Sequence, residues 1–513
     1  MNEIPVIKDD RGIPTLYVKG KPFIALAGEV HNSSASSLKY MEERVWNSIK
    51  ELNMNTLIIP IYWETIEQKE GIYDFTLVDG IIEQARSNEK HIILLWFGLW
   101  KNSESMYVPG WMKKNSDTYF RVKKVSGEKI DTISPFCEKA IEKDAMAFAQ
   151  VMAHIREFDQ DKSTVIAMQI ENEIGLLGTE SDYCEAAVEV FQNEIPEELA
   201  KEYSVSGDWK SSFKENAEEY FMAFYFAKAV EKIAEAGKKE YPIPFYANAW
   251  LKQHPWYPGS YPSGGPVKDV HRIWKCMAPS LFTLAPDIYV PYAIDVMEEY
   301  QYEGNPLLIP EARKDAVTAS YSLYAFMKHN AICYSPFGIE DLGLPPELVM
   351  KPTKEMMAAL NINPIMFDTD GGKEYLSRVY DLIENLKPLY FKYRGTKHMQ
   401  SYIRKSDTDS GTFLRFDEYD VTVDYFPSMP GLPISTGVIF ELETNKFLIV
   451  GMMNRLDFRV KPGENKKVRA LKLEDGTIMK GKWIPGHQQN GDEQMQFNLG
   501  PVPTCLCVEL YKY

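Results

Sequence analysis

Apolar runs of strand length recur along the first two thirds of the chain, and most are separated by enough sequence for a helix. Eight such runs occupy residues 23–28, 56–63, 91–97, 165–170, 244–249, 287–291, 307–309 and 331–337. Their Ile, Leu, Val and aromatic content is nearly continuous, as in strands that are covered on both faces. Eight parallel strands alternating with helices predict an α/β fold of the (β/α)8 barrel type.

The intervening segments carry the periodicity of helices. Between the first two runs, apolar residues recur at steps of three and four, with Glu42, Glu43 and Lys50 on the other face. Residues 145–155 and 220–236 have comparable helical character. Residues 375–386 predict a last helix that ends before Pro388, because proline disfavours a helix interior.

The pattern changes after this last helix. Short strand-like segments at 421–426, 437–442 and 446–451 are separated by Gly, Pro and Asn turns, which is typical of an antiparallel β-sandwich. We therefore expect a catalytic barrel over residues 1–391 and a β-sandwich accessory domain over residues 392–513. Such a sandwich could bind sugar or brace the barrel, and bracing is the favoured interpretation, because a fold alone does not establish a function.

Charge and composition narrow the class of ligand. The net charge is −16 and the pI is near 5.2, so a polyanion such as nucleic acid would be repelled. Aromatic residues make up 13% of the chain, which supplies flat faces for stacking on sugar rings, although most such residues serve in cores. A neutral ligand is favoured.

The cysteines and the start of the chain indicate a reduced compartment. The six cysteines contain no CxxC pair and are too sparse for a disulfide framework. The opening residues lack a basic start and an apolar signal, and no later run has membrane-spanning length. We expect a cytoplasmic protein without membrane partners. No HExxH spacing or phosphate loop occurs in the sequence, so we expect neither a metal nor a cofactor.

Two acidic residues close apolar strands far apart in the sequence. Glu173 follows the fourth run and Glu311 follows the seventh, and barrel closure can bring such strand ends to one pocket. Hydrolysis of a glycoside with retention requires two carboxyl groups about 5 to 5.5 Å apart. Asn172 could bind the sugar 2-OH if a turn or bulge brings it to the same side. Glu171 shares the strand face of Glu173, so alternation alone does not exclude it.

The chain resembles glycoside hydrolase clan A and, within it, family 35, the β-galactosidase-like enzymes. The resemblance covers roughly residues 10–350 and rests on Asn172-Glu173, on Glu311, and on residues 63–75, which are similar to the signature W-x-x-x-E-P-x-x-G-x-Y-D-F. Gln68 stands in place of the signature proline. The likeness implies that Glu173 is the acid/base and Glu311 the nucleophile, and it makes the signature residues Trp63 and Glu67 candidates for substrate binding.

Further substrate-binding candidates follow from the same resemblance. Glu29, at the end of the first run, matches the strand end that holds the terminal sugar in this family. Tyr289 and Tyr292 lie where clan members place a tyrosine that donates a hydrogen bond to the nucleophile, and either could serve, as could a role in the core. Asn248, at the end of the fifth run, could bind a hydroxyl group.

These observations favour a retaining exo-glycoside hydrolase that removes terminal β-D-galactosyl residues from oligosaccharides. A hydrolase of another β-glycoside or of an α-L-arabinopyranoside would use the same residues. A non-catalytic carbohydrate-binding protein is the alternative from another class, and the presence of both Glu173 and Glu311 argues against it. The expected partner is an oligosaccharide substrate, and a homo-oligomer is compatible with the sequence.

Overall fold

The computed structural model describes residues 3–349, 353, 355, 357, 364–495 and 497–513. Two compact units are formed by segments that are discontinuous in sequence. The first unit comprises residues 1–46, 55–288 and 299–311, and the second comprises residues 47–54, 289–298 and 312–513. The expected domain limit at residue 391 therefore stays a prediction.

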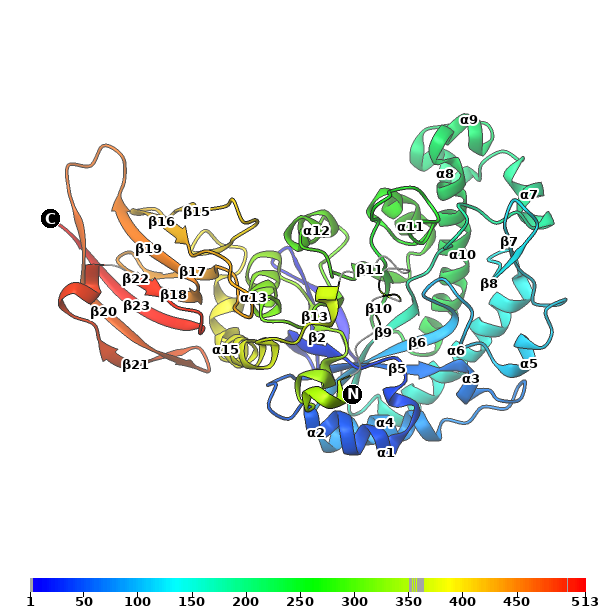
Figure 1. The fold of residues 1–513 in the computed structure, drawn as a ribbon, viewed down its shortest axis with the longest axis horizontal. Coiled ribbons are helices and arrows are strands. Elements are labelled where there is room, and N and C mark those ends of the chain that lie inside the picture. The colour runs from blue at the N-terminus through cyan, green and yellow to red at the C-terminus, as the bar shows by residue number, and fades with distance from the viewer. Residues whose placement is uncertain (1–2, 350–352, 354, 356, 358–363, 496) are drawn as a thin grey trace. The chain divides into compact units, whose positions relative to one another are not determined.

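An eight-stranded sheet forms the nearly closed barrel that the sequence predicts (Figure 1). Neighbouring strands follow the order β11-β10-β9-β6-β5-β4-β13-β12. The pairs β4–β5, β5–β6, β6–β9, β9–β10 and β10–β11 are parallel. The strands are β4 (Ala25–Glu29), β5 (Thr56–Tyr62), β6 (His91–Lys101), β9 (Val165–Asn172), β10 (Phe245–Ala249), β11 (Leu281–Pro286), β12 (Ile309–Ala312) and β13 (Cys333–Pro336). Nearly all of their residues are buried, as strands between two layers require.

Helices lie between the barrel strands, and the longest is α10, which packs against α6. The predicted segments at 145–155 and 220–236 lie within α6 and α10 and are confirmed. The principal helices are α1 (Leu38–Tyr40), α2 (Trp46–Ser48), α3 (Trp63–Ile66), α4 (Thr76–Ser87), α5 (Gly110–Lys113), α6 (Glu138–Asp159), α10 (Ala217–Glu240), α11 (His271–Met277), α12 (Ala293–Tyr300), α13 (Val317–His329) and α15 (Gly372–Tyr393). A π-helical turn (Met41–Val45) joins α1 to α2. The segment between β9 and α10 contains α7 (Glu185–Phe191), α8 (Glu197–Tyr203) and α9 (Trp209–Phe213).

Three predicted element limits are wrong. The seventh strand is Ile309–Ala312 rather than 307–309, so Glu311 lies within it. The sixth strand is Leu281–Pro286 rather than 287–291, because Asp287 already leaves the sheet after its amide binds the Ala249 carbonyl at 3.1 Å. The last helix runs through Pro388 to Tyr393. Its buried face continues with Tyr390 beyond the proline, and packing of that face outweighs the lost backbone hydrogen bond.

Two small sheets were not expected. An antiparallel sheet precedes the barrel and consists of β1 (Val6–Asp10), β2 (Ile13–Val18) and β3 (Lys21–Phe23). A hairpin of β7 (Arg121–Lys123) and β8 (Lys129–Ile133) lies between β6 and α6. Their short and partly exposed strands lack the long apolar runs that reveal barrel strands.

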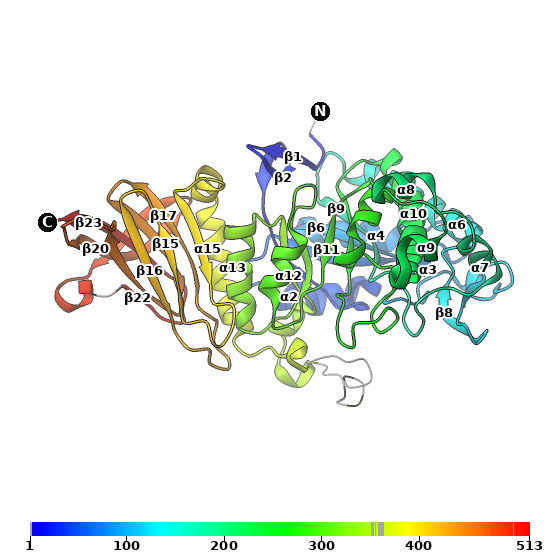
Figure 2. The ribbon, with the colours of Figure 1, turned by 90° about the horizontal axis from the view of Figure 1, so that it is seen from above.

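The C-terminal region forms the predicted antiparallel sandwich, which Figure 2 shows as two layers of strands. One sheet has the order β14-β17-β18-β23-β20-β21 and the other β15-β16-β19-β22. Side chains from both sheets, including Tyr419, Val421, Phe447 and Leu506, form one buried core. The strands are β14 (Met399–Ile403), β15 (Gly411–Arg415), β16 (Tyr419–Tyr425), β17 (Thr436–Glu443), β18 (Lys446–Met452), β19 (Asn454–Val460), β20 (Val468–Met479), β21 (Lys482–Gln488), β22 (Phe497–Leu499) and β23 (Thr504–Lys512).

Within the described part of the chain, no helix combines the length and apolarity needed to cross a bilayer.

Candidate active site

The backbone is irregular at the end of β9, which allows the adjacent residues Asn172 and Glu173 to face the same site. Glu171 and Glu173 have left-handed backbone conformations, with φ of 59° and 46°. The pairing of β9 with β6 shifts in register between Trp96 and Lys101. This irregularity is the bulge that Asn172 requires in order to reach the same side as Glu173.

Three buried carboxyl groups meet at the ends of different strands. One oxygen of each of Glu173, Asp287 and Glu311 lies within 4.8 Å of the others. The three residues are 8%, 3% and 5% exposed, respectively. The structure thus brings together the two predicted glutamates, which are separated by more than a hundred residues, and adds Asp287 directly after β11.

Asn248 links all three acidic residues. Its Oδ1 accepts a hydrogen bond of 2.9 Å from the backbone N–H of Glu173. Its Nδ2 donates to Asp287 Oδ2 at 2.7 Å and to Glu311 Oε1 at 3.4 Å. Asn248 is fully buried in β10 and positions the acidic groups, and its predicted contact with a substrate hydroxyl stays a prediction.

Asn172 gives Glu311 a second amide donor. Its Nδ2 lies 3.2 Å from Glu311 Oε1, while its Oδ1 accepts a hydrogen bond of 2.7 Å from Lys101 Nζ. Lys101 can only donate and is 4% exposed, so it fixes which end of the Asn172 amide faces Glu311. Two amide donors on one oxygen suit a carboxylate that must stay charged.

The environment holds a proton on Glu173. Burial and the negative charge of Glu311 raise the pKa of Glu173 to about 8, against smaller opposing effects of Lys101 and of a hydrogen bond with Asp287. Burial, together with Glu311 and Glu173, also raises the pKa of Asp287 well above its usual value. At neutral pH the cluster therefore combines a protonated Glu173 with an amide-bound Glu311, which is the division of roles that acid-assisted displacement needs.

Glu171 is excluded from this cluster by its partners. Its two oxygens accept hydrogen bonds from the backbone N–H groups of Leu99 at 3.1 Å and Trp100 at 2.7 Å. It also shares a hydrogen bond with Asp144 of α6, and both side chains are fully buried. Of the two glutamates that strand alternation left open, Glu173 is the one beside Glu311.

Trp63 and Glu67 contact each other rather than the carboxyl cluster. The indole Nε1 of Trp63 donates to Glu67 Oε2 at 2.7 Å, and Glu67 Oε1 accepts from the backbone of Gly71 at 2.7 Å. Trp63 is fully buried and packs against Trp96 and Trp111. These contacts give the signature segment a structural role, and its contact with substrate stays a prediction.

The remaining predicted residues differ in their relation to the cluster. Glu29 is fully buried at the end of β4, and its charge contributes to the raised pKa of Asp287, which places it near the site. Tyr289 and Tyr292 belong to the second compact unit, where Tyr289 is half-buried and Tyr292 is 38% exposed. Their predicted hydrogen bond to the nucleophile stays a prediction.

Sequence reasoning missed Asp287 and Lys101. The sequence pattern places Asp287 at the start of the sixth strand, because the residues after it resemble a strand more than the observed strand with Thr283 does. Lys101 is the last residue of the long apolar strand β6, and a lysine at such a position is expected to be exposed at the edge of the barrel. The sequence shows only a lysine shortly after an apolar run, and its burial beside Asn172 is known from the structure alone.

The three carboxyl groups also form the one cluster in the described residues whose donor atoms could surround a cation. Carboxylate oxygens are ligands for hard divalent ions. The expectation that the protein needs no metal stays a prediction.

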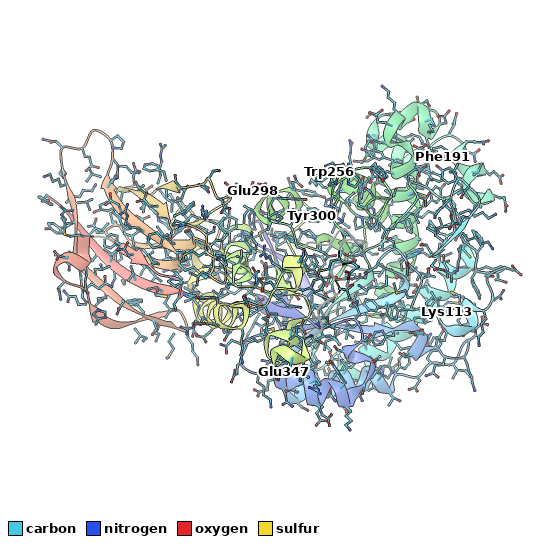
Figure 3. All side chains as sticks on the ribbon, in the orientation of Figure 1. Lys113, Phe191, Trp256, Glu298, Tyr300 and Glu347 are labelled. Carbon is cyan, nitrogen blue, oxygen red and sulfur yellow. The ribbon has the colours of Figure 1, made fainter. Side chains whose placement is uncertain are left out.

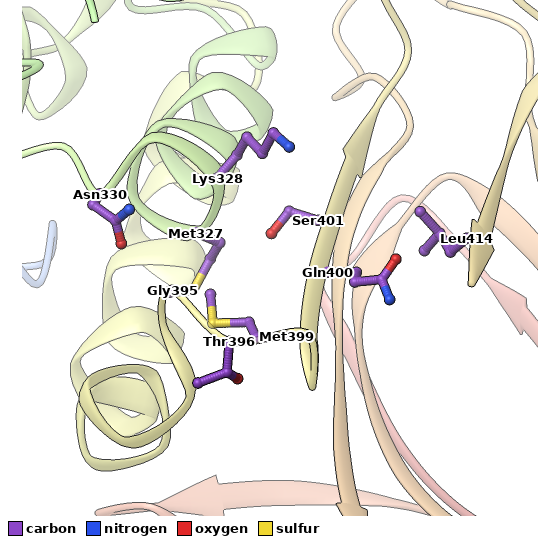
Figure 4. Close-up of a pocket in the computed structure, with 9 residues that line it drawn as sticks. All are labelled: Met327, Lys328, Asn330, Gly395, Thr396, Met399, Gln400, Ser401 and Leu414. Carbon is purple, nitrogen blue, oxygen red and sulfur yellow. The ribbon is translucent and has the colours of Figure 1, made fainter. Parts of the chain in front are cut away.

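A separate cavity of about 260 Å³ lies in the second unit, between the end of α13 and β14 (Figure 4). Met327, Lys328, Asn330, Gln400 and Ser401 are among the residues that line it, and its lining contains no carboxyl side chain. It therefore lacks the groups for acid catalysis.

Comparison with known proteins agrees with this geometry. Residues 15–249 match the family model of glycosyl hydrolases family 35, and residues 376–499 match DUF5597, a domain of unknown function. The first match includes Glu173 and five barrel strands, whereas Glu311 lies beyond it. No curated protein sequence matches the chain significantly.

Several solved structures are similar to this chain. The β-galactosidase from the psychrophilic Marinomonas ef1 is 11% identical with a TM-score of 0.47, and the match covers 71% of this chain but only 60% of that one. The catalytic domain of β-amylase from Paenibacillus polymyxa is 11% identical with a TM-score of 0.48, covering 67% of this chain and 100% of that one. The β-galactosidase from Bacillus circulans sp. alkalophilus is 10% identical with a TM-score of 0.49, covering 94% and 99%.

The strand-end glutamates, the signature segment and the family match agree with one another. Residues 15–249 thus resemble the glycosyl hydrolases of family 35, whose family model they match.

Proposed function

We propose that the protein is a retaining exo-glycosidase that removes terminal β-D-galactosyl residues from oligosaccharides by double displacement. The observation that carries this proposal is the approach of Glu173 and Glu311, whose nearest oxygens lie within 4.8 Å. Retaining enzymes hold their carboxyl groups about 5 to 5.5 Å apart, whereas inverting enzymes need about 6.5 to 9.5 Å to admit a water molecule. The short separation favours direct attack by a carboxylate.

The two glutamates would act in turn. Glu311 attacks the anomeric carbon while Glu173 donates its proton to the leaving oxygen, which gives a glycosyl ester on Glu311 and a free leaving-group sugar. Glu173, now a carboxylate, takes a proton from water as the water oxygen attacks the anomeric carbon, and the bond from that carbon to Glu311 breaks and releases the Glu311 carboxylate. Asp287 has a raised pKa, and in its protonated form it adds no second negative charge beside Glu311.

Burial of the carboxyl groups supports attack at chain ends. Glu173 and Glu311 are 8% and 5% exposed, so an internal sugar flanked on both sides would have little access to them. A terminal sugar can enter with its free end first. The galactosyl preference is taken from the family 35 match and from the signature segment at 63–75.

Azide rescue tests the reaction and both roles together. Glu311→Gly should be nearly inactive on an activated β-galactoside, and added azide should yield α-galactosyl azide by attack opposite the leaving group. Glu173→Gly should retain a slow first step on the same substrate, and azide should trap the ester as β-galactosyl azide. The opposite product from each variant would exchange the roles, and a wild-type enzyme that releases α-galactose first would exclude retention.

A panel of aryl glycosides tests the sugar. The highest kcat/KM is expected for the β-D-galactoside, against the β-D-glucoside, β-D-mannoside and α-L-arabinopyranoside. Binding without turnover of any member would instead favour the carbohydrate-binding alternative.

A further inference from the structure

Two large aromatic side chains stand exposed on the loop that follows β10. Trp256 is 53% exposed and Tyr257 is 61% exposed, whereas most of the other tryptophans and tyrosines described in the structure are less exposed. Figure 3 shows Trp256 at the solvent-facing margin of the green part of the chain. Adjacent exposed aromatic rings on a barrel loop indicate an interaction surface.

Hydrogen bonds to backbone groups define the conformation of the loop that carries these rings. Trp256 adopts a left-handed backbone with φ of 72°, and its N–H donates to the Gln253 carbonyl at 2.9 Å. The Tyr257 carbonyl accepts hydrogen bonds from both the backbone N–H and the hydroxyl of Ser260, at 3.0 and 2.6 Å. A bulky residue in this backbone region is strained, and strain of this kind concentrates at sites of function.

The same loop is clamped to the segment that follows Glu173. Leu176 and Ser263 exchange backbone hydrogen bonds of 3.0 and 2.9 Å. Gly178 donates to the Gly259 carbonyl at 2.8 Å. The two loops approach so closely that a Cβ on Gly259 would lie 2.8 Å from the backbone of Thr179. The aromatic loop is therefore held against the segment that follows Glu173.

We propose that Trp256 and Tyr257 form a stacking subsite for the saccharide on the leaving-group side of the scissile bond. The leaving oxygen takes its proton from Glu173, so the leaving sugar must lie on the side of Glu173, and the aromatic loop is bound to the segment on that side. The C–H faces of a neutral sugar pack on aromatic rings without an ionic contribution, which suits a protein with a net charge of −16. The inference rests on the proposed function and extends it to substrates with an extended leaving group.

The test compares two substrates that differ on the leaving-group side. β-D-Galactosyl fluoride carries no sugar there, whereas a β-galactosyl trisaccharide carries two. Trp256→Ala and Tyr257→Ala should each lower kcat/KM for the trisaccharide about five- to tenfold, mainly through KM. Both should leave kcat/KM for the fluoride within about twofold of wild type. Trp256→Phe keeps an aromatic face and should recover most of the loss.

The matched control is Tyr40→Ala, which removes a ring that is 43% exposed on α1 and should change neither substrate. Unchanged values for the trisaccharide in both loop variants would overturn the inference while leaving the proposed function intact. Equal losses on both substrates would also overturn it, because the fluoride carries no sugar for the two rings to contact. A wild-type enzyme that hydrolyses neither substrate would refute the proposed function and the inference with it.

Discussion

The protonation of Glu173, the proposed acid, should set the pH range of activity. Its pKa is raised to about 8 by burial and by the charge of Glu311, and only the protonated form can serve as the acid. We therefore expect kcat/KM for a β-galactoside to be maintained below this value and to fall as pH rises through about 8.

Substitution of Glu311 tests the cause of this shift. Glu311→Gln removes the neighbouring negative charge, so the pKa of Glu173 should fall, as measured by 13C NMR titration of its labelled carboxyl group. Glu89→Gln, which removes an exposed charge between α4 and β6, should leave it unchanged. An unaltered titration in Glu311→Gln would contradict the electrostatic explanation.

Asp144 and Glu171 form a second buried acidic pair, with consequences for stability. Burial raises the pKa of Asp144 to about 6 and that of Glu171 well above its usual value. The folded state thus holds protons that the unfolded chain releases above about pH 4, so the free energy of unfolding should fall as pH rises from about 4 through 6. Asp144→Asn should raise the free energy of unfolding at pH 8 by about 1 to 3 kcal/mol, as measured by urea denaturation.

Asp159, on the same helix, provides the matched control. It is also buried, but it pairs with Arg86 at 2.7 Å and accepts from the Val165 N–H at 2.7 Å. Asp159→Asn should therefore lower the free energy of unfolding by about 2 kcal/mol. A loss in both variants would show that Asp144 is a stabilising anion and would refute the shared-proton interpretation.

At the scale of elements, β6 and β9 depend on Gly98. A Cβ at this position would lie 2.4 Å from Trp96 Nε1, 2.5 Å from Asp144 Oδ2 and 2.6 Å from Glu171 Oε1. Gly98→Ala should therefore lower the free energy of unfolding by about 1 to 3 kcal/mol and reduce kcat, because the strand end before Glu173 must shift. Thermal unfolding and steady-state kinetics measure the two effects.

Gly110 is the matched position for this substitution. It begins α5, has no left-handed backbone, and has no atom within 4 Å of an added Cβ. Gly110→Ala should leave stability unchanged or raise it by about 0.5 kcal/mol, since alanine favours helix. Equal effects at Gly98 and Gly110 would refute the steric argument.

Element prediction from sequence succeeded where apolar content was continuous. Residues 56–63 and 91–97 predicted β5 and β6 closely because fully buried strands need long apolar runs. It failed at β11, where Thr283 interrupts the pattern, and at Pro388, where tertiary packing outweighs helix propensity. The pattern records local preference, whereas these two limits depend on neighbours that are distant in sequence.

At the scale of the whole molecule, the local nature of sequence patterns also explains which residues of the site could be predicted. Glu173 and Glu311 follow apolar runs, so the barrel frame alone placed them at one end. The roles of Asp287 and Lys101 depend on which atoms face them after folding, and no local pattern carries that information. The Glu171 alternative was likewise resolved only by Asp144, which lies on a helix outside the strand.

All six cysteines of the chain are free thiols, and this gives a prediction for the intact protein. Five are buried, and burial raises the pKa of Cys184 to about 11 and that of Cys505 to about 12. Native protein should react with a thiol reagent at no more than one site at pH 8, and urea-unfolded protein at six. Cys276→Ser should abolish the native reaction, whereas rapid labelling of several thiols would contradict the packing.

The side-chain amide of Asn248 makes different contacts with the two glutamates. Its oxygen must face the Glu173 N–H, which can only donate, so its nitrogen must face Glu311 and Asp287. Rotation of the side chains alone would therefore not exchange the proposed roles of the two glutamates. A sugar hydroxyl group that replaces water in the attack on the glycosyl ester would have to approach from the side of Glu173. Any transglycosylation would therefore require the acceptor sugar to bind on that side.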